Sequence, residues 1–414
     1  MTVPVKNIKE AISFAGFVVI GLNFLITGML INFFQLLLWV GLKPMSSTLY
    51  HKINYYLTYA VWGQMEFLAE WWSSSTCIVY TDDKTWAKMG SEHAILLLNH
   101  SYEVDWLFSW FLCEHVKMLG SAKAFVKKSF KKVPIIGWTA LFSESAFLER
   151  SWEKDKSILE NQITNMSKCP DPVMLHVFAE GTRYTPEKHA ASVEFAQKSG
   201  FPPLKHLLVP RTKGFVLSVE KLRGKFPAIY CATMVFDTKE GAAPVFKSLV
   251  LGRPIAAEIL VERIPLEDIP EDSDKISNWL HENYQHKDKM IDIFKTEGKF
   301  PTSLPGHHFE GPIRSHYRPR RLWTLLTIVI TSFLTLPTVC CAFYSLFCSG
   351  IVNVVIGVVL LGLVVVALLK LMDLSSASKG SEPTELIQQM SYMIDKSKFM
   401  LVQRITNLIV HLLT

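Results

Sequence analysis

The sequence has little of what marks several common classes of protein. Its seven cysteines show no paired spacing typical of zinc sites or disulfide frameworks, so we expect a reducing compartment and no structural metal. No Gly-x-Ser-x-Gly segment occurs, so nothing indicates a serine nucleophile on a strand-to-helix turn. A net charge of only +6 over 414 residues does not indicate a nucleic-acid partner.

Charge is absent from two long stretches, which predict segments inside a membrane. The composition, 49% apolar with a mean hydropathy of +0.22, is too apolar for an average soluble protein. Ala11–Leu42 has 32 residues without a charge, more than the apolar part of a signal peptide needs. It fits one tilted span, or a bent pair of helices in one leaflet because polar and small residues interrupt it at Asn23, Gly28, Asn32 and Gln35.

The second uncharged stretch, Leu322–Leu369, has 48 residues, enough for two spans of about 20 residues each. Arginines precede it and Lys370 follows it, so a helical hairpin over residues 322–370 with both ends in the cytosol satisfies the positive-inside rule. In the tail, residues 371–414, apolar residues recur at helical spacing from Leu386 to Leu412. This pattern predicts an amphipathic helix that lies on the membrane or docks on the domain, or else binds a partner helix.

Residues 73–321 read as one folded domain, which follows an N-terminal membrane part of residues 1–72. Strand-like runs are predicted at Ala94–Leu98, Val173–Phe178, Leu207–Pro210, Ala228–Phe236 and Ala256–Ile264. The segments between them are long enough for helices, so the alternation favours an α/β sheet flanked by helices. Acidic capping residues near Ser273 predict a surface helix, and Lys52–Trp72 fits either an interfacial helix or a core helix.

The strand Ala94–Leu98 leads into residues that can do chemistry. Its end delivers Asn99 and His100, and Asp105 follows five residues after the histidine. The carboxyl ends of strands are where open α/β sheets usually hold their ligands. If a helix starts there, Asp105 can return to one imidazole nitrogen and leave the other as a general base for a substrate hydroxyl. A core histidine and an unrelated carboxylate would give the same spacing.

Four further stretches carry candidate residues, each with a plain structural alternative. Lys117–Lys132 has six lysines in 16 residues and no acid, which suits phosphates or anionic headgroups, or only a solvated face. In FAEGTR (178–183), glycine permits close approach and arginine offers a fork for phosphate oxygens, although many strands end in such a turn. VPRTKG (209–214) places two cations after a rigid proline, although a plain strand end with solvent-facing charges would have the same sequence. FLER (147–150) alone indicates no function.

Taken together, these blocks carry a resemblance. NHSYEVD, FLER, FAEGTR and VPRTKGF resemble, in order and separation, the sequence blocks of the glycerolipid acyltransferase family. The best match is to its 1-acylglycerol-3-phosphate (lysophosphatidic acid) acyltransferases of eukaryotic endoplasmic reticulum membranes. The resemblance covers roughly residues 20–321 and includes EWW (70–72), PIIGW (134–138) and PLEDIPE (265–271). It implies an acyltransferase-type α/β fold, acyl-CoA as donor, lysophosphatidic acid as acceptor and phosphatidic acid as product.

The resemblance assigns the chemistry to the first block. His100 would deprotonate the sn-2 hydroxyl of the acceptor, Asp105 would orient the imidazole, and Asn99 would brace the loop. Because the acceptor brings its own hydroxyl, direct attack on the thioester needs no acylated serine or cysteine. No cofactor is implied beyond acyl-CoA as co-substrate.

Acceptor binding would fall to the later blocks. Arg183, with Gly181 and Thr182, would hold the acceptor's phosphate, and Lys127 would help to neutralise it. Glu180 is expected to hold Arg183 or Thr182 in place rather than to touch substrate. The remaining carried-over residues would have architectural or acyl-chain roles; they are Arg150 and Pro210.

Several alternatives stay open at this point. Ser129 stands where many family members carry an acid, and Tyr102–Val104 leave the acceptor headgroup undecided. Another lysophospholipid acceptor is one alternative, and a non-catalytic membrane protein that binds or reshapes lipid is another. The resemblance implies a multi-pass protein of the endoplasmic reticulum membrane with its catalytic domain facing the cytosol. Membrane lipids are expected partners, and the oligomeric state is undecided.

Overall fold

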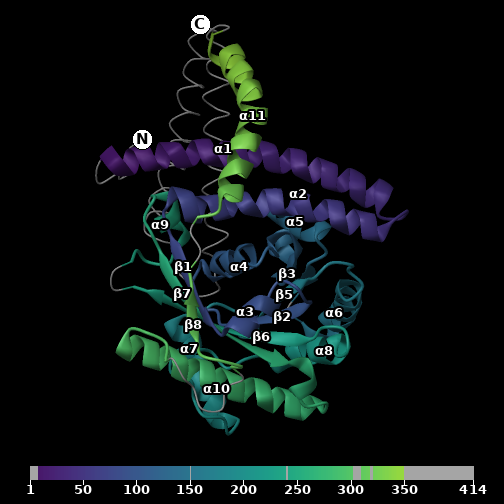
Figure 1. Ribbon diagram of the computed structural model, residues 1–414, viewed down its shortest axis with the longest axis vertical. Helices are drawn as coiled ribbons and strands as arrows, with labels where there is room; N and C mark the ends of the chain where they lie inside the picture. Colours follow the sequence, from purple (N-terminus) through teal and green to yellow (C-terminus); the bar gives the residue numbers. More distant parts are fainter. Residues whose placement is uncertain (1–7, 150, 239–240, 302–308, 318–319, 349–414) are drawn as a thin grey trace, which may run out of the picture.

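A computed structural model describes residues 8–149, 151–238, 241–301, 309–317 and 320–348. Its centre is a sheet that helices cover on both faces (Figure 1). The α/β class predicted from alternating strands and helices is therefore confirmed. The strands are β1 (Thr76–Thr81), β2 (Ala94–Leu98), β3 (Ala122–Lys127), β4 (Ala146–Leu148), β5 (Met174–Phe178), β6 (Ala228–Asp237), β7 (Ala256–Pro265) and β8 (Arg314–His316).

Helices precede, separate and follow these strands. They are α1 (Ile8–Leu37), α2 (Ser47–Phe67), α3 (Asp83–Lys88), α4 (Asp105–His115), α5 (Ile136–Phe142), α6 (Trp152–Met166), α7 (Pro186–Lys198), α8 (Thr212–Leu222), α9 (Phe246–Val250), α10 (Ser273–Glu297) and α11 (Leu322–Cys348). Figure 1 shows α1 and α2 side by side across the α4 side of the sheet, and α10 on the opposite side.

The strand order within the described residues is β4-β3-β5-β2-β6-β7-β1-β8. The strands from β4 to β6 in this order run parallel, β7 is antiparallel to β6, β1 is parallel to β7, and β8 is antiparallel to β1. After β2 the chain passes to β3, toward the β4 end of the sheet. After β5 it passes to β6, toward the β8 end. Such a switch of direction opens a crevice at the carboxyl ends of β2 and β5, where ligands of open α/β sheets bind.

The apolar run of β2 follows from its burial on both faces. Leu96 and Leu98 pack into the core beside α4, which includes Phe108, whereas Ile95 and Leu97 pack into the core on the α10 side. Successive side chains of a strand point to opposite faces, so a central parallel strand covered on both sides has no polar alternation. The predicted strand Ala94–Leu98 is confirmed residue for residue.

The N-terminal apolar stretch forms one continuous helix, so of the two alternatives left open by the sequence, the bent pair of helices is wrong. α1 runs into a π-helical turn, Leu38–Leu42, with no break at Gly28. The polar residues face neighbouring helices: Asn23 Nδ2 lies 3.3 Å from Gln64 Oε1, and Gln35 Nε2 lies 2.9 Å from Asn54 Oδ1. Within the described residues, one helical stretch, residues 15–42, is long and apolar enough to span a membrane.

Helix α2 combines the two predicted alternatives for Lys52–Trp72. Its second half is core, since Val61, Trp62 and Met65 are buried in the cluster that contains the α4 residues. Its first turns expose Leu49 and Tyr56. The helix is therefore neither wholly interfacial nor wholly internal.

Helix α11 covers the first part of the stretch that was predicted to form a C-terminal hairpin. It continues without interruption past Pro337. Thr331 and Thr335 bind Asn23, at 3.2 and 2.9 Å, so α11 packs on α1 through hydrogen bonds. The second arm and the amphipathic helix predicted between residues 386 and 412 lie outside the described residues.

Several strand predictions are confirmed and others are wrong. Val173–Phe178, Ala228–Phe236 and Ala256–Ile264 correspond to β5, β6 and β7. Leu207–Pro210 is not a strand, because backbone N–H groups in this segment and next to it bind the two residues that follow β5. Leu208 N donates to the Glu180 side chain at 3.2 Å, and Arg211 N donates to the Ala179 carbonyl at 2.7 Å. The strands missed by the sequence reading are β1, β3, β4 and β8.

Two other sequence features resolve clearly. α10 begins at the predicted place, since Asp272 accepts hydrogen bonds from the backbone N–H groups of Asp274 and Lys275. It is not only a surface helix, because one face is buried against the sheet. The lysine-rich stretch 117–132 is not a single basic face either, because it contains β3 and Lys123 points into the interior, 6% exposed.

Candidate active site

The register of β2 and β5 builds the site. Leu98 pairs with Phe178 in parallel, so the residues two positions beyond them, His100 and Glu180, emerge side by side at the carboxyl edge. His100 N donates to Glu180 Oε1 at 2.6 Å, and the His100 carbonyl accepts from Tyr184 N at 2.9 Å. The backbone of His100 is therefore bonded to the Glu180 side chain of the third block and to the backbone of Tyr184, the residue after that block.

His100 and Asp105 lie in contact, as the spacing predicted. His100 Nδ1 and Asp105 Oδ2 are 3.0 Å apart, and the same oxygen accepts from Tyr102 N at 2.8 Å. Asp105 opens α4, so the turn between β2 and α4 returns its carboxylate to the histidine. Burial raises the pKa of Asp105, while the hydrogen bond from His100 opposes that rise. The Asp105 side chain is 1% exposed and the His100 side chain 24%, so the imidazole is the group that a ligand can reach.

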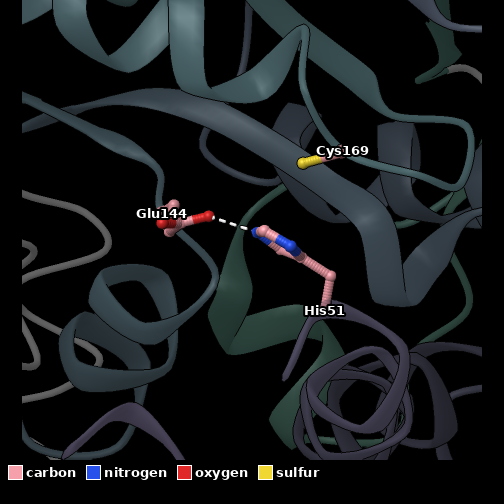
Figure 2. Close-up of side chains that lie close together, drawn as sticks. All are labelled: His51, Glu144 and Cys169. Atoms are coloured by element: carbon pink, nitrogen blue, oxygen red, sulfur yellow. Dashed lines mark hydrogen bonds and ion pairs between the residues drawn. The ribbon is translucent and has the colours of Figure 1, made fainter. Parts of the chain in front are cut away.

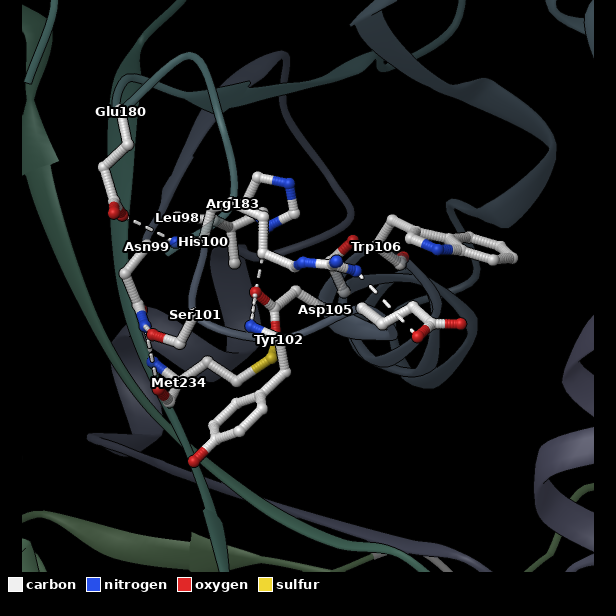
Figure 3. Close-up of polar contacts among 12 residues, drawn as sticks. Leu98, Asn99, His100, Ser101, Tyr102, Asp105, Trp106, Glu180, Arg183 and Met234 are labelled. Carbon is white, nitrogen blue, oxygen red and sulfur yellow. Dashed lines mark hydrogen bonds and ion pairs between the residues drawn. The ribbon is translucent and has the colours of Figure 1, made fainter. Parts of the chain in front are cut away.

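Glu180 braces the histidine loop rather than Arg183 or Thr182, which corrects the expectation from sequence. One carboxylate oxygen accepts from His100 N (Figure 3). The other accepts from Leu208 N. Burial raises the pKa of Glu180 to about 8, although both backbone N–H groups favour the charged form. The residue therefore ties the His100 loop to the segment before α8.

Replacing Glu180 with glutamine is expected to flatten the pH dependence of stability. Burial raises the pKa of Glu180 from 4.5 to about 8, so between these values the folded protein holds a proton that the unfolded chain releases. The contribution of this group to stability consequently falls as the pH rises through that window. In thermal unfolding followed by tryptophan fluorescence, the Tm of E180Q should decrease less with pH than that of the wild type. Equal slopes would contradict the assignment.

Asn99 braces the loop, as expected. Its side-chain amide donates to the Met234 carbonyl at 2.9 Å and accepts from Met234 N at 2.8 Å, which fastens the loop to β6. Tyr284 and Lys287 of α10 add supports that the sequence reading missed: Tyr284 donates to the Leu98 carbonyl at 3.0 Å and Lys287 to the Leu97 carbonyl at 3.0 Å. Their spacing of three residues places both side chains on one face of the helix, which the sequence could show. Nothing in the sequence indicated that this face packs against β2.

The EGTR turn holds its arginine beside the histidine loop. Gly181 has φ +67, and a Cβ there would lie 3.0 Å from Arg211 Cδ, so both conformation and space favour glycine. Arg183 Nη1 lies 3.9 Å from Glu103 Oε2, an acid of the first block, and both side chains are largely buried. The sequence reading gave Glu103 no role. Thr182 is half-buried at the same edge.

The other predicted site residues are placed less closely. Lys127 ends β3 at the same edge of the sheet, one strand beyond β5, and is exposed. Pro210 is buried. It lies in the chain between Leu208, which binds Glu180, and Arg211, which binds the Ala179 carbonyl. Arg150 lies outside the described residues. Their functional roles stay predictions.

A cavity of about 380 Å³ adjoins the loop on its α10 side. Ser101 and Tyr102 form one wall, and the end of β6 with Lys295 of α10 forms another. Neither His100 nor Arg183 lines it. The histidine and the arginine, which follow β2 and β5 at the same edge of the sheet, therefore lie outside this cavity.

Comparison with known proteins places the chain in a family. A family model described as acyltransferase matches residues 78–233, and one described as acyltransferase C-terminus matches residues 248–331. The 1-acyl-sn-glycerol-3-phosphate acyltransferase gamma of Homo sapiens is 38% identical over 331 residues, 80% of this chain and 84% of that protein. The chain belongs to the acyltransferase family. The delta protein of Bos taurus is 40% identical over 306 residues, 73% of this chain and 76% of that protein.

The acyltransferase match covers the whole crevice, since residues 78–233 include β2, β5 and the turns that follow them. No solved structure matches the chain. His100, Asp105 and Arg183 of this acyltransferase all lie within the matched residues.

Proposed function

We propose that this acyltransferase moves an acyl chain from acyl-CoA to the sn-2 hydroxyl of lysophosphatidic acid and so forms phosphatidic acid. The observation that carries the proposal is the 3.0 Å contact between His100 Nδ1 and Asp105 Oδ2 at the open edge of the sheet. Relatives named as 1-acyl-sn-glycerol-3-phosphate acyltransferases, which match 73–80% of the chain, support the choice of acceptor.

His100 acts as the general base. With Nδ1 engaged by Asp105, Nε2 accepts the proton of the sn-2 hydroxyl as its oxygen attacks the thioester carbonyl. A new ester C–O bond forms, the C–S bond breaks, and the leaving CoA thiolate takes the proton back from the imidazolium. Asp105 stabilises the imidazolium during the step, since its buried carboxylate faces the ring.

The phosphate of the acceptor binds beside this base. Arg183 follows the turn that Glu180 fastens to His100, and the next residue, Tyr184, donates its N–H to the His100 carbonyl. A guanidinium can give two parallel hydrogen bonds to phosphate oxygens. The side chain of Arg211 lies against Gly181 in the same turn and adds a second positive charge. Lys127 at the same edge contributes longer-range attraction.

The membrane would meet the enzyme along α1. Its outer face exposes large apolar side chains, among them Val19 at 65% and Phe33 at 54%, which in water would form an unusually large apolar surface. We infer that this face lies in lipid and that the enzyme works at an endoplasmic reticulum membrane from the cytosolic side. Acyl-CoA would then reach the strand ends from water and the acceptor from the bilayer.

An acceptor panel tests the proposal. Purified full-length protein in lipid nanodiscs is given acyl-CoA with lysophosphatidic acid, lysophosphatidylcholine or lysophosphatidylinositol, and CoA release and lipid products are followed. The proposal expects the highest kcat/KM with lysophosphatidic acid. A preference for another headgroup would change the acceptor, and no CoA release with any of them would favour the non-catalytic lipid-binding alternative.

Replacing Asp105 with asparagine is expected to lower kcat with little change in either KM. Asparagine keeps an oxygen near the ring but removes the charge, and a charge-assisted hydrogen bond is worth about 1.5–3 kcal/mol, a loss of about 10- to 10²-fold. The matched control is Asp83→Asn, because Asp83 is exposed and pairs only with the distant β8 region in the described contacts. An asparagine variant of Asp105 with unchanged kcat would contradict its orienting role.

A further inference from the structure

A second polar cluster lies at the other edge of the sheet. Cys169 precedes β5 at its amino end, opposite the edge that carries His100. His51 reaches it from α2 and Glu144 from the end of α5, and their polar atoms all lie within 4.8 Å of one another (Figure 2). Lys123 Nζ lies 3.5 Å from the Cys169 sulfur. None of these residues takes part in the proposed acyl transfer.

The charges in the cluster favour a thiolate over a bound metal. Glu144 already meets three cationic groups: Lys43 Nζ at 2.6 Å, His51 Nε2 at 2.6 Å and Lys123 Nζ at 3.8 Å. A divalent ion would have to enter beside these positive charges and displace Lys123 from the sulfur. The single carboxylate of Glu144 does not balance three positive charges, whereas a thiolate at Cys169 would add a second negative charge.

The titration behaviour of the groups agrees. Burial alone would raise the pKa of Cys169, but His51 and the charge of Lys123 lower it below its ordinary value. Contacts with Cys169 and Glu144 raise the pKa of His51 to about 9, so the imidazole is protonated at neutral pH. Thiolates next to Lys and protonated His are the reactive cysteines of proteins.

Backbone conformation also marks the cluster. Glu144 has φ +63, a left-handed conformation that is rare for a residue with a side chain. The contacts to Lys43 and His51 offset that strain and keep the carboxylate turned toward the imidazole. The cluster joins α2 and the segment before it to β3 and β5, which holds the thiol in a fixed setting.

We propose that Cys169 is an oxidation site, a thiolate activated by His51 and Lys123 that reacts with hydrogen peroxide. The sulfur attacks one peroxide oxygen, the S–O bond forms and the O–O bond breaks. Sulfur is oxidised to a sulfenic acid, and the leaving hydroxide takes a proton from the His51 imidazolium to give water. The side chain of Cys169 is 7% exposed, so a small oxidant fits where a lipid or a CoA ester would not.

The test compares cysteines within one protein. Full-length protein in nanodiscs is treated with dilute hydrogen peroxide, sulfenic acid is trapped with dimedone, and labelled peptides are quantified by mass spectrometry. Cys169, 7% exposed, is expected to be labelled at least about tenfold faster than Cys77, Cys113 and Cys231, which are 2%, 0% and 5% exposed and have raised pKa values. Equal or slower labelling of Cys169 would overturn the proposal.

Variants separate activation from access. Lys123→Met and His51→Gln should each slow labelling of Cys169 about tenfold, because each removes a positive charge beside the sulfur. Lys168→Met is the matched control, since Lys168 adjoins Cys169 in the chain but is exposed, and its labelling rate should equal that of the wild type. An equal slowing in the control would show that charge at the sulfur is not the cause.

Two measurements on the wild type remain decisive if a variant does not fold. As the pH falls from 8.5 to about 7, iodoacetamide labelling of Cys169 should fall less steeply than that of an ordinary thiol, which loses up to about tenfold per pH unit. A steep loss would contradict the thiolate. Pre-incubation with Zn²⁺ should leave labelling unchanged; one equivalent of bound Zn²⁺ that protects Cys169 would replace the proposal with a metal site.

Discussion

Alanine in place of His100 should reduce the kcat of acyl transfer by about 10²- to 10⁴-fold, the contribution of a positioned general base. The imidazole is the exposed half of the pair with Asp105, and its backbone N–H is held by Glu180 independently of the side chain. Removal of the ring therefore leaves the loop in place and takes away the proton acceptor. The KM for acyl-CoA should change little, because no step assigned to His100 binds the donor.

The control is another histidine on the same domain. His281 of α10 stacks on Phe201, away from the crevice, and His281→Ala should keep wild-type kcat. Product formation is measured in nanodiscs with lysophosphatidic acid, and thermal unfolding establishes that both variants are folded. A His100 variant that is folded and turns over at the wild-type rate would remove the base from the mechanism, whatever the family of the chain.

Much of this site could be predicted because its parts are local in sequence. The five-residue spacing from His100 to Asp105 needs only a strand that ends and a helix that begins, and both are visible in the apolar run and the polar loop. The pairing of the histidine loop with the EGTR turn is different, because it depends on the register Leu98 to Phe178 between strands about 80 residues apart. Only the resemblance linked these two blocks before the structure.

The failures have a common physical cause. Glu180 was expected to hold Arg183 or Thr182, yet its partners are backbone N–H groups of the loop and of the Leu208 segment, which carry no sequence signature. Because of the same contacts, Leu207–Pro210 is an irregular segment and not the predicted strand. Composition had also placed Lys123 on a basic surface, although β3 buries it beside Cys169. In each case a long-range contact overrides a local pattern.

The polar residues of α1 make the same point. Asn23 and Gln35 interrupt an apolar stretch, which suggested a bend. In a helix packed against others, buried amides find partners on the neighbouring helices, here Gln64 and Asn54 of α2. A single continuous helix and a bent pair therefore have the same sequence pattern, and only the partner helices distinguish them.

Alanine in place of Arg183 should lower kcat/KM for lysophosphatidic acid by about 10²- to 10⁴-fold, mainly through KM. Two charge-assisted hydrogen bonds to a phosphate, each worth about 1.5–3 kcal/mol, account for this loss. The KM for acyl-CoA should stay close to the wild-type value. Arg183→Lys should recover only part of the loss, because an ammonium keeps the charge without the planar pair of donors.

The acceptor separates loss of phosphate binding from damage to the site. With a monoacylglycerol, which has no phosphate, Arg183→Ala should turn over as fast as the wild type, however slowly that is. Arg314→Ala is the matched control, because Arg314 is exposed on β8 and pairs with Asp83. Equal losses with both acceptors would mean that Arg183 supports the crevice through Glu103, 3.9 Å away, and that the phosphate is bound by other cations.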